Sequence, residues 1–135
     1  MTKIDMDYDK YVDTAQEASK SVDAKDYDTA LRLLTDLVQS DLPDLDKSMM
    51  CFNLAVVWDK KGNSLEVLRW YDRAIQFEKP HHRYFAQLEK AAYLIGIDRK
   101  EEAFSIYRAL STKPFLLLSD QQKIQAYIRH LEGVR

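Results

Sequence analysis

The sequence predicts an all-α protein in which about seven helices pair into three antiparallel hairpins followed by a final helix. Apolar residues recur at spacings of three and four along nearly the whole chain, and no segment alternates with the period of two that marks a half-buried strand. Only three glycines and three prolines occur, too few for the many turns of a β-sandwich. A two-helix unit also recurs along the chain.

The first expected hairpin joins a helix ending near Val22 to a helix that Pro43 closes. Proline lacks a backbone donor and clashes with the preceding helical turn, so it marks a helix end. The apolar stripes of these two helices are Tyr8, Tyr11, Val12, Ala15, Ala18 and Val22, then Ala30, Leu31, Leu33, Leu34, Leu37 and Val38.

The second expected hairpin turns at Gly62 and closes near Pro80. Glycine adopts the left-handed conformation that commonly ends a helix, so Gly62 suits the turn. The two apolar stripes are Met49, Phe52, Leu54, Ala55 and Trp58, then Leu65, Leu68, Tyr71, Ala74 and Ile75.

The third expected hairpin has Gly96 at the end of its first helix and Pro114 beyond its second. Its stripes are Phe85, Leu88, Ala91, Ala92 and Ile95, then Ala103, Phe104, Ile106, Tyr107 and Leu110. Ser119 predicts an N-cap for the final helix, with Gln122 as its capping-box partner. The intervening FLLL run at 115–118 is expected to tuck against the last hairpin, with an exposed docking strip as the alternative.

The hairpins repeat at a nearly fixed interval. The second helices restart in KDYDTAL at 25–31, GNSLEVL at 62–68 and DRKEEAF at 98–104, so that Ala30, Val67 and Ala103 lie 37 and 36 residues apart. This period is typical of stacked helical arrays. One domain over residues 1–135 is expected, with repeats at about 8–43, 46–80 and 81–114 and a capping helix at about 119–132. Four small residues are expected to let helices approach closely: Ala55, Ala74, Ala92 and Ala103.

The middle unit carries the most specific pattern, which is Cys51, Leu54, Ala55 and Trp58, then Val67, Tyr71, Ala74 and Pro80. In this order of large, small and aromatic residues the units resemble tetratricopeptide repeats, over roughly residues 8–114. The resemblance implies a right-handed superhelix of stacked hairpins. Val67 replaces a small residue of the family pattern, Glu17 stands where leucine is expected, and the turn before Ala103 is one residue short.

Composition excludes several classes of function. Net charge is −2 and the pI is near 5.9, so there is no basic footprint for nucleic acid. No apolar run reaches the length of about 18 residues that a membrane span needs. The single cysteine, Cys51, forms no internal disulfide and fits a reducing compartment, so the expected location is the cytoplasm.

Charge is unevenly distributed. Residues 1–47 hold 6 Lys/Arg and 12 Asp/Glu, whereas residues 48–135 hold 14 and 10. The asymmetry could steer a partner or favour head-to-tail contact between copies. The favoured interpretation is simpler, a solvated acidic face on the first helices.

No catalytic site, metal site or cofactor is expected. No second cysteine or carboxylate stands at metal-ligand spacing near His81, His82 or His130. The glycines at 62, 96 and 133 do not form a phosphate-binding loop. Cys51 lies on an apolar stripe and is read as a core residue.

The resemblance implies a concave groove, lined by the first helix of each hairpin, that holds a peptide or a partner helix. Its expected residues are Val12, Gln16 and Ser19 in the first unit, Met49, Phe52, Asn53, Val56 and Lys60 in the middle unit, and Ala86, Glu89, Lys90 and Tyr93 in the third. The alternative is that Met49 and Phe52 pack inside. Trp70 is read as a packing residue, because Leu33 and Ile106 occupy the equivalent places.

The expected function is therefore a non-catalytic protein-binding module, an adaptor or chaperone-like scaffold, with a protein or peptide as partner. Neither nucleic acid nor a membrane is an expected partner. The alternative is a self-associating structural protein, a homo-oligomer in which the acidic N-terminal end meets the more basic remainder.

Overall fold

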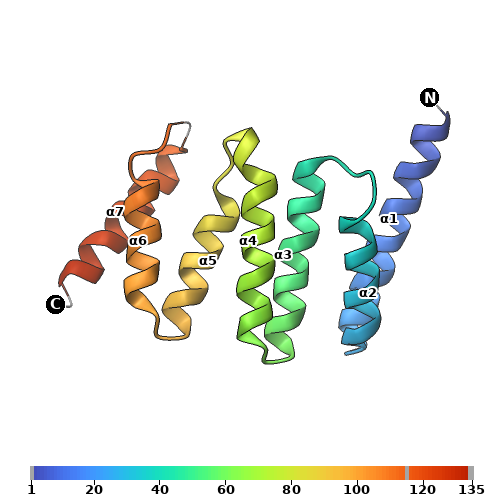
Figure 1. Cartoon of the computed structure of the whole chain (residues 1–135), viewed down its shortest axis with the longest axis horizontal. Helices are drawn as coiled ribbons and strands as arrows, with labels where there is room; N and C mark the ends of the chain where they lie inside the picture. Colours follow the sequence, from blue (N-terminus) through green and yellow to red (C-terminus); the bar gives the residue numbers. More distant parts are fainter. Residues whose placement is uncertain (1, 115, 134–135) are drawn as a thin grey trace. The chain divides into compact units, whose positions relative to one another are not determined.

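The structure is a computed structural model that describes the backbone of residues 2–114 and 116–133, and the side chains of residues 8–114 and 116–133. Within these ranges every regular element is helical (Figure 1). The elements are α1 (Thr2–Asp23), α2 (Tyr27–Val38), α3 (Asp44–Lys60), α4 (Ser64–Glu78), the short 3-10 helix η1 (Lys79–His81), α5 (Phe85–Gly96), α6 (Lys100–Leu110) and α7 (Leu118–Gly133). The predicted all-α fold with about seven helices is confirmed.

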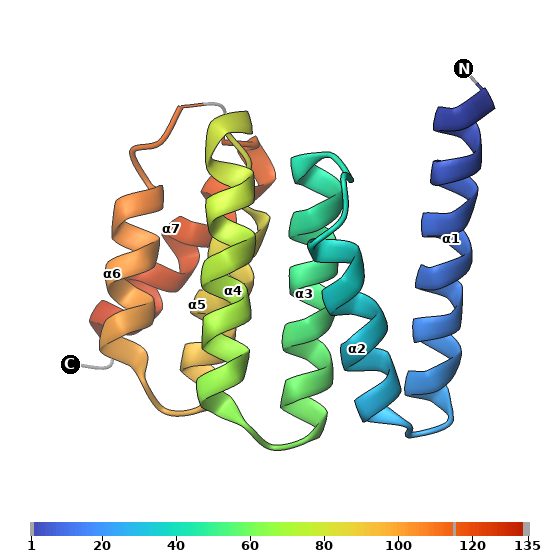
Figure 2. The same ribbon diagram turned by 45° about the vertical axis from the view of Figure 1, so that its right-hand side comes forward.

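The chain forms two compact units, residues 1–77 and 78–135. In the first unit α1 packs against α2 and α2 against α3. Helices α3 and α4 lie side by side in both views (Figure 2), and the ring of Phe52 lies near that of Tyr71. In the second unit α5 packs against α6 and α6 against α7. The single domain expected over residues 1–135 stays a prediction.

The three hairpin turns share one backbone design. Lys25, Gly62 and Asp98 adopt left-handed φ angles of 61°, 76° and 64°. The next amide in each turn donates to the carbonyl five residues earlier, which gives Asp26 to Ser21 at 2.8 Å, Asn63 to Trp58 at 3.1 Å and Arg99 to Leu94 at 2.8 Å. These bonds satisfy carbonyls that the end of a helix leaves free. Positions in different hairpins can therefore be compared by their distance from the left-handed residue.

Core positions recur at fixed distances from these turns. Alanine lies seven residues before the left-handed residue in every hairpin, at Ala18, Ala55 and Ala91, and each is at most 1% exposed. Five residues after it stand Ala30, Val67 and Ala103, each 0% exposed. Nine residues after it stand Leu34, Tyr71 and Tyr107, all buried. The described hairpins are thus repeats of one helix–turn–helix design.

Three local predictions about the third hairpin and α7 are wrong. Ala92 is exposed, and Ala91 is the small buried residue that matches Ala55. The turn before Ala103 is not short, since Asp98 precedes Ala103 by the same five residues that separate Gly62 from Val67. The interval of 36 residues between Val67 and Ala103, one shorter than the preceding interval, therefore arises before Asp98 and not in the turn. Ser119 is not an N-cap, because α7 begins at Leu118.

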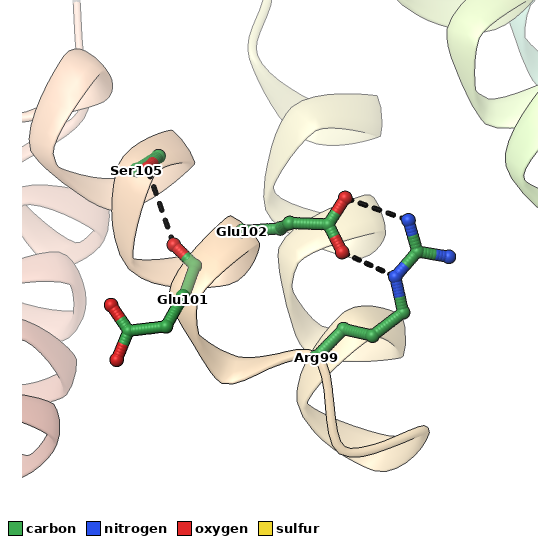
Figure 3. A network of polar contacts seen from close by, with 4 residues as sticks. All are labelled: Arg99, Glu101, Glu102 and Ser105. Atoms are coloured by element: carbon green, nitrogen blue, oxygen red, sulfur yellow. Dashed lines mark hydrogen bonds and ion pairs between the residues drawn. The ribbon is translucent and has the colours of Figure 1, made fainter.

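Residues that follow the left-handed position cap the second helices. The Asp26 carboxylate accepts from the Thr29 amide at 3.3 Å, and the Asn63 amide oxygen accepts from the Glu66 amide at 3.1 Å. Arg99 has no side-chain acceptor, so α6 lacks such a cap. Its guanidinium instead donates two hydrogen bonds to the Glu102 carboxylate (Figure 3), and this contact holds the pKa of Glu102 below its ordinary value. The negative charges of Glu101 and Glu102, in the first turn of α6, also interact favourably with the positive end of the helix dipole.

A buried carboxylate serves the start of α5. Glu78 is 5% exposed and accepts from the Ala86 amide at 2.8 Å. Tyr84, at the N-cap position of α5, makes no side-chain cap, so Glu78 satisfies one of the free amides of the first turn. Burial raises the pKa of Glu78 above its ordinary 4.5, against the smaller lowering effects of the Ala86 hydrogen bond and of Arg83.

We expect Glu78 to make the protein less stable as pH rises. The folded protein holds this proton more tightly than the unfolded chain does, so the free energy of unfolding should fall as pH rises from 4.5 through the folded-state pKa. Glu78→Gln keeps an acceptor for the Ala86 amide but does not ionise, and should flatten this dependence. Urea unfolding of both proteins across this pH window measures the difference. Parallel pH profiles would contradict the expectation.

Candidate functional site

A cleft of about 200 Å³ lies in the first unit, where α1 and α3 face each other with α2 behind them. Its lining residues are Ala15, Ala18, Ser19 and Val22 of α1, Leu34 of α2, and Asn53, Val56 and Val57 of α3. The α1 wall consists of small residues and one valine at helical spacing, so its side chains project little into the cleft. The buried positions Ala18 and Leu34 belong to the repeated core, which fixes the base of the cleft.

The polarity of the cleft is concentrated in two side chains, the Ser19 hydroxyl and the Asn53 amide. Neither side chain is hydrogen-bonded to another described residue, and both are accessible, Ser19 exposed and Asn53 half-buried. The other lining side chains are apolar. An occupant can therefore bury apolar atoms here and exchange hydrogen bonds with two groups on opposite walls.

Three residues of the predicted groove line this cleft: Asn53 and Val56 from α3, and Ser19 from the opposite helix. Other predicted residues lie on the same two helices but outside the lining: Val12, Gln16, Met49, Phe52 and Lys60. Sequence reasoning missed Ala15, Ala18, Val22, Leu34 and Val57 as lining residues. The sequence had placed Ala15, Ala18 and Val22 on the apolar stripe of the first helix and Leu34 on that of the second.

Phe52 and Met49 differ in their surroundings. The Phe52 ring lies 6.2 Å from the Tyr71 ring, with 43° between their planes, and Phe52 is half-buried. It therefore packs at least partly against α4, as the alternative expected. Met49 is 45% exposed and remains accessible on α3.

The predicted groove residues of the third hairpin lie on α5 in the second unit. Glu89 stands nine residues before the left-handed residue of its turn, as Gln16 and Asn53 do in theirs. Lys90 and Tyr93 occupy the positions of Leu54 and Val57, and both are half-buried. Ala86 is fully buried. The roles of Glu89, Lys90 and Tyr93 in a groove stay predictions.

Other chemistry-bearing residues are accounted for by packing. Cys51 is fully buried, and desolvation raises its pKa to about 11, so its thiol stays protonated at neutral pH. Among the described residues, no group of three or more His, Cys, Asp and Glu side chains could hold a metal ion. In the run at 115–118, Leu116 is buried, Leu117 and Leu118 are each 68% exposed, and Phe115 lies outside the described residues.

Neither a protein-family model nor a curated protein matches the sequence. None of the helices in the described ranges combines the length and the apolar character that a bilayer crossing requires.

Proposed function

We propose that the chain is a non-catalytic protein-binding module of the tetratricopeptide type, an adaptor or chaperone-like scaffold of the cytoplasm, whose hairpins stack into a right-handed superhelix. Its partner is a peptide or a helix of another protein, held between α1 and α3. The supporting observation is the cleft itself, in which unpaired Ser19 and Asn53 face apolar walls. Apolar contacts would supply affinity and these two groups would bond the partner backbone.

The size of the cleft favours part of a polypeptide over a metabolite. Its volume is about 200 Å³, whereas small-molecule sites occupy roughly 300–1,000 Å³. No charged side chain lines it, so it offers no anchor for a phosphate or a carboxylate of a cofactor. One or two apolar side chains of a partner fit this space and this chemistry.

Self-association is the second candidate function, and charge favours it. The first unit carries 10 Lys/Arg and 15 Asp/Glu, and the second carries 10 and 7. Opposite net charges on the two units would attract the first unit of one copy to the second unit of another. Light scattering at low and high salt separates the candidates. A salt-sensitive oligomer would favour assembly, and a monomer at both salt concentrations would favour the peptide receptor.

Filling the cleft should abolish binding. We expect Ser19→Phe to place a ring between α1 and α3. Peptides that were selected for binding to the parent protein from a random display library should bind this variant at least about tenfold more weakly. Affinity is measured by calorimetry or fluorescence, after circular dichroism has shown that the variant is folded.

Ser105→Phe is the matched control, because Ser105 is exposed on α6 in the other unit. It should bind the selected peptides as the parent does. If Ser19→Phe also retained parental affinity, the working surface would lie outside this cleft.

A further inference from the structure

Cationic and aromatic side chains gather on a second surface of the first unit, which we term the α4 cluster: Lys47 of α3 and Arg69, Trp70, Arg73 and Phe77 of α4. The Arg73 guanidinium carbon lies 5.5 Å from the Trp70 ring centroid and 5.7 Å from that of Phe77. Arg69 lies 5.9 Å from the Trp70 ring, and the Lys47 ammonium lies 5.9 Å from the Phe77 ring. The cluster therefore has three cations around two rings.

Arg73 is the distinctive member of the α4 cluster. Arg69 is engaged by Glu66 at 3.3 Å, whereas no carboxylate of the described residues forms an ion pair with Arg73. Two acids, Glu66 and Asp72, lie in the same stretch of α4, and Glu66 is the acid that pairs with Arg69. Contacts with two rings restrain the Arg73 guanidinium, and its N–H groups can still donate to an acceptor. A fork held in this way is prepared for a bidentate carboxylate.

The surface beside Arg73 also offers an apolar contact. A shallow depression of about 550 Å³ runs along α4, where Leu65, which is 79% exposed, lies in line with both arginines. An extended segment could thus place a carboxylate on Arg73 and an apolar side chain on Leu65.

The surrounding charge restricts the class of ligand. The first unit carries 15 acidic and 10 basic residues, so it repels a long polyanion such as a nucleic acid. A short acidic segment can meet the local cations and avoid the rest of the surface. We propose that the α4 cluster binds a short carboxylate-rich segment of a partner protein, with Arg73 and Lys47 as its charged contacts. This surface is separate from the cleft and does not depend on it.

The test uses an end-blocked oligoglutamate peptide, with oligoglutamine of the same length as the neutral comparison. Oligoglutamate should bind the parent saturably at low salt, with a change in tryptophan fluorescence, and oligoglutamine should not. Arg73→Gln should weaken binding by about tenfold or more. Arg73→Lys keeps the charge but loses the planar guanidinium, so its affinity for oligoglutamate should lie between those of the parent and Arg73→Gln.

Arg108→Gln is the matched control, because Arg108 lies over a single ring, that of Phe104, at 5.2 Å in the second unit. It should bind oligoglutamate as the parent does. The proposal is overturned if the folded parent shows no saturable binding, if Arg73→Gln binds as well as the parent, or if the two peptides bind equally. Parent oligomers that oligoglutamate dissociates would also overturn it, since the occupant would then be the acidic end of a second copy. Loss of binding in Arg73→Gln without loss of cleft peptides separates this surface from the proposed groove.

Discussion

Replacing Ala74 with arginine should lower the free energy of unfolding by about 3–5 kcal/mol, or unfold the first unit outright. Ala74 is 0% exposed on α4 and stands twelve residues after Gly62. Leu37 and Leu110 occupy the same position in the other hairpins and are also buried. A long cation at this position must either displace packed helices or lose its hydration without a partner. Thermal melts followed by circular dichroism measure the loss.

Ala92→Arg provides the control for this result. It introduces the same side chain into a helix at an alanine that is exposed, so its melting temperature should stay close to that of the parent. If the two variants melted alike, the core face assigned to α4 would be wrong.

Removing residues 119–135 should unfold or aggregate the second unit. Helix α7 packs against α6, where the rings of Tyr107 and Tyr127 stack at 4.9 Å with 5° between their planes. Ile124 and Leu131 are buried on the same helix. Burial of each large apolar side chain contributes about 1.5–3 kcal/mol, so the deletion removes several such contributions together. End units of a helical array need a polar cover for the same reason.

Size-exclusion chromatography and thermal melts report the outcome of this truncation. A folded remnant should also bring the pKa of Tyr107 from about 12, where burial holds it, back towards 10.0. The double variant Gln125→Ala and Arg129→Ala, which changes only exposed side chains of α7, should melt as the parent does. A soluble truncated chain of parental stability would identify α7 as a detachable segment.

The helices could be predicted because their signals are local. A period near 3.6 and prolines at 43, 80 and 114 mark the helices without reference to tertiary structure. The third hairpin shows the limit of this reasoning. Gly96 was expected to end the first helix of this hairpin and α5 does end there, but the left-handed residue of the turn is Asp98. Aspartate tolerates that conformation more readily than most residues, so the glycine preference is not a requirement.

The candidate sites depended on distances that no local pattern contains. Asn53 and Val56 could be placed on an accessible face of α3 from their spacing. The contribution of Ala15 and Val22 required the separation of α1 from α3, which packing against α2 sets. The arrangement of Arg73 between Trp70 and Phe77 depends on side-chain rotamers, although their spacing on α4 placed them on one flank of the helix.

The equivalent turns bear on how the chain tolerates insertions and deletions. Each buried position lies at a fixed count from the left-handed residue of its own hairpin, so a length change in a connector such as residues 39–43 leaves the faces of both flanking hairpins unrotated. The same change inside α3 would turn every residue on one side of it by about 100° relative to the turn. Length variation among descendants of this sequence should therefore collect between hairpins, while the residue count from α3 through Gly62 to α4 stays constant.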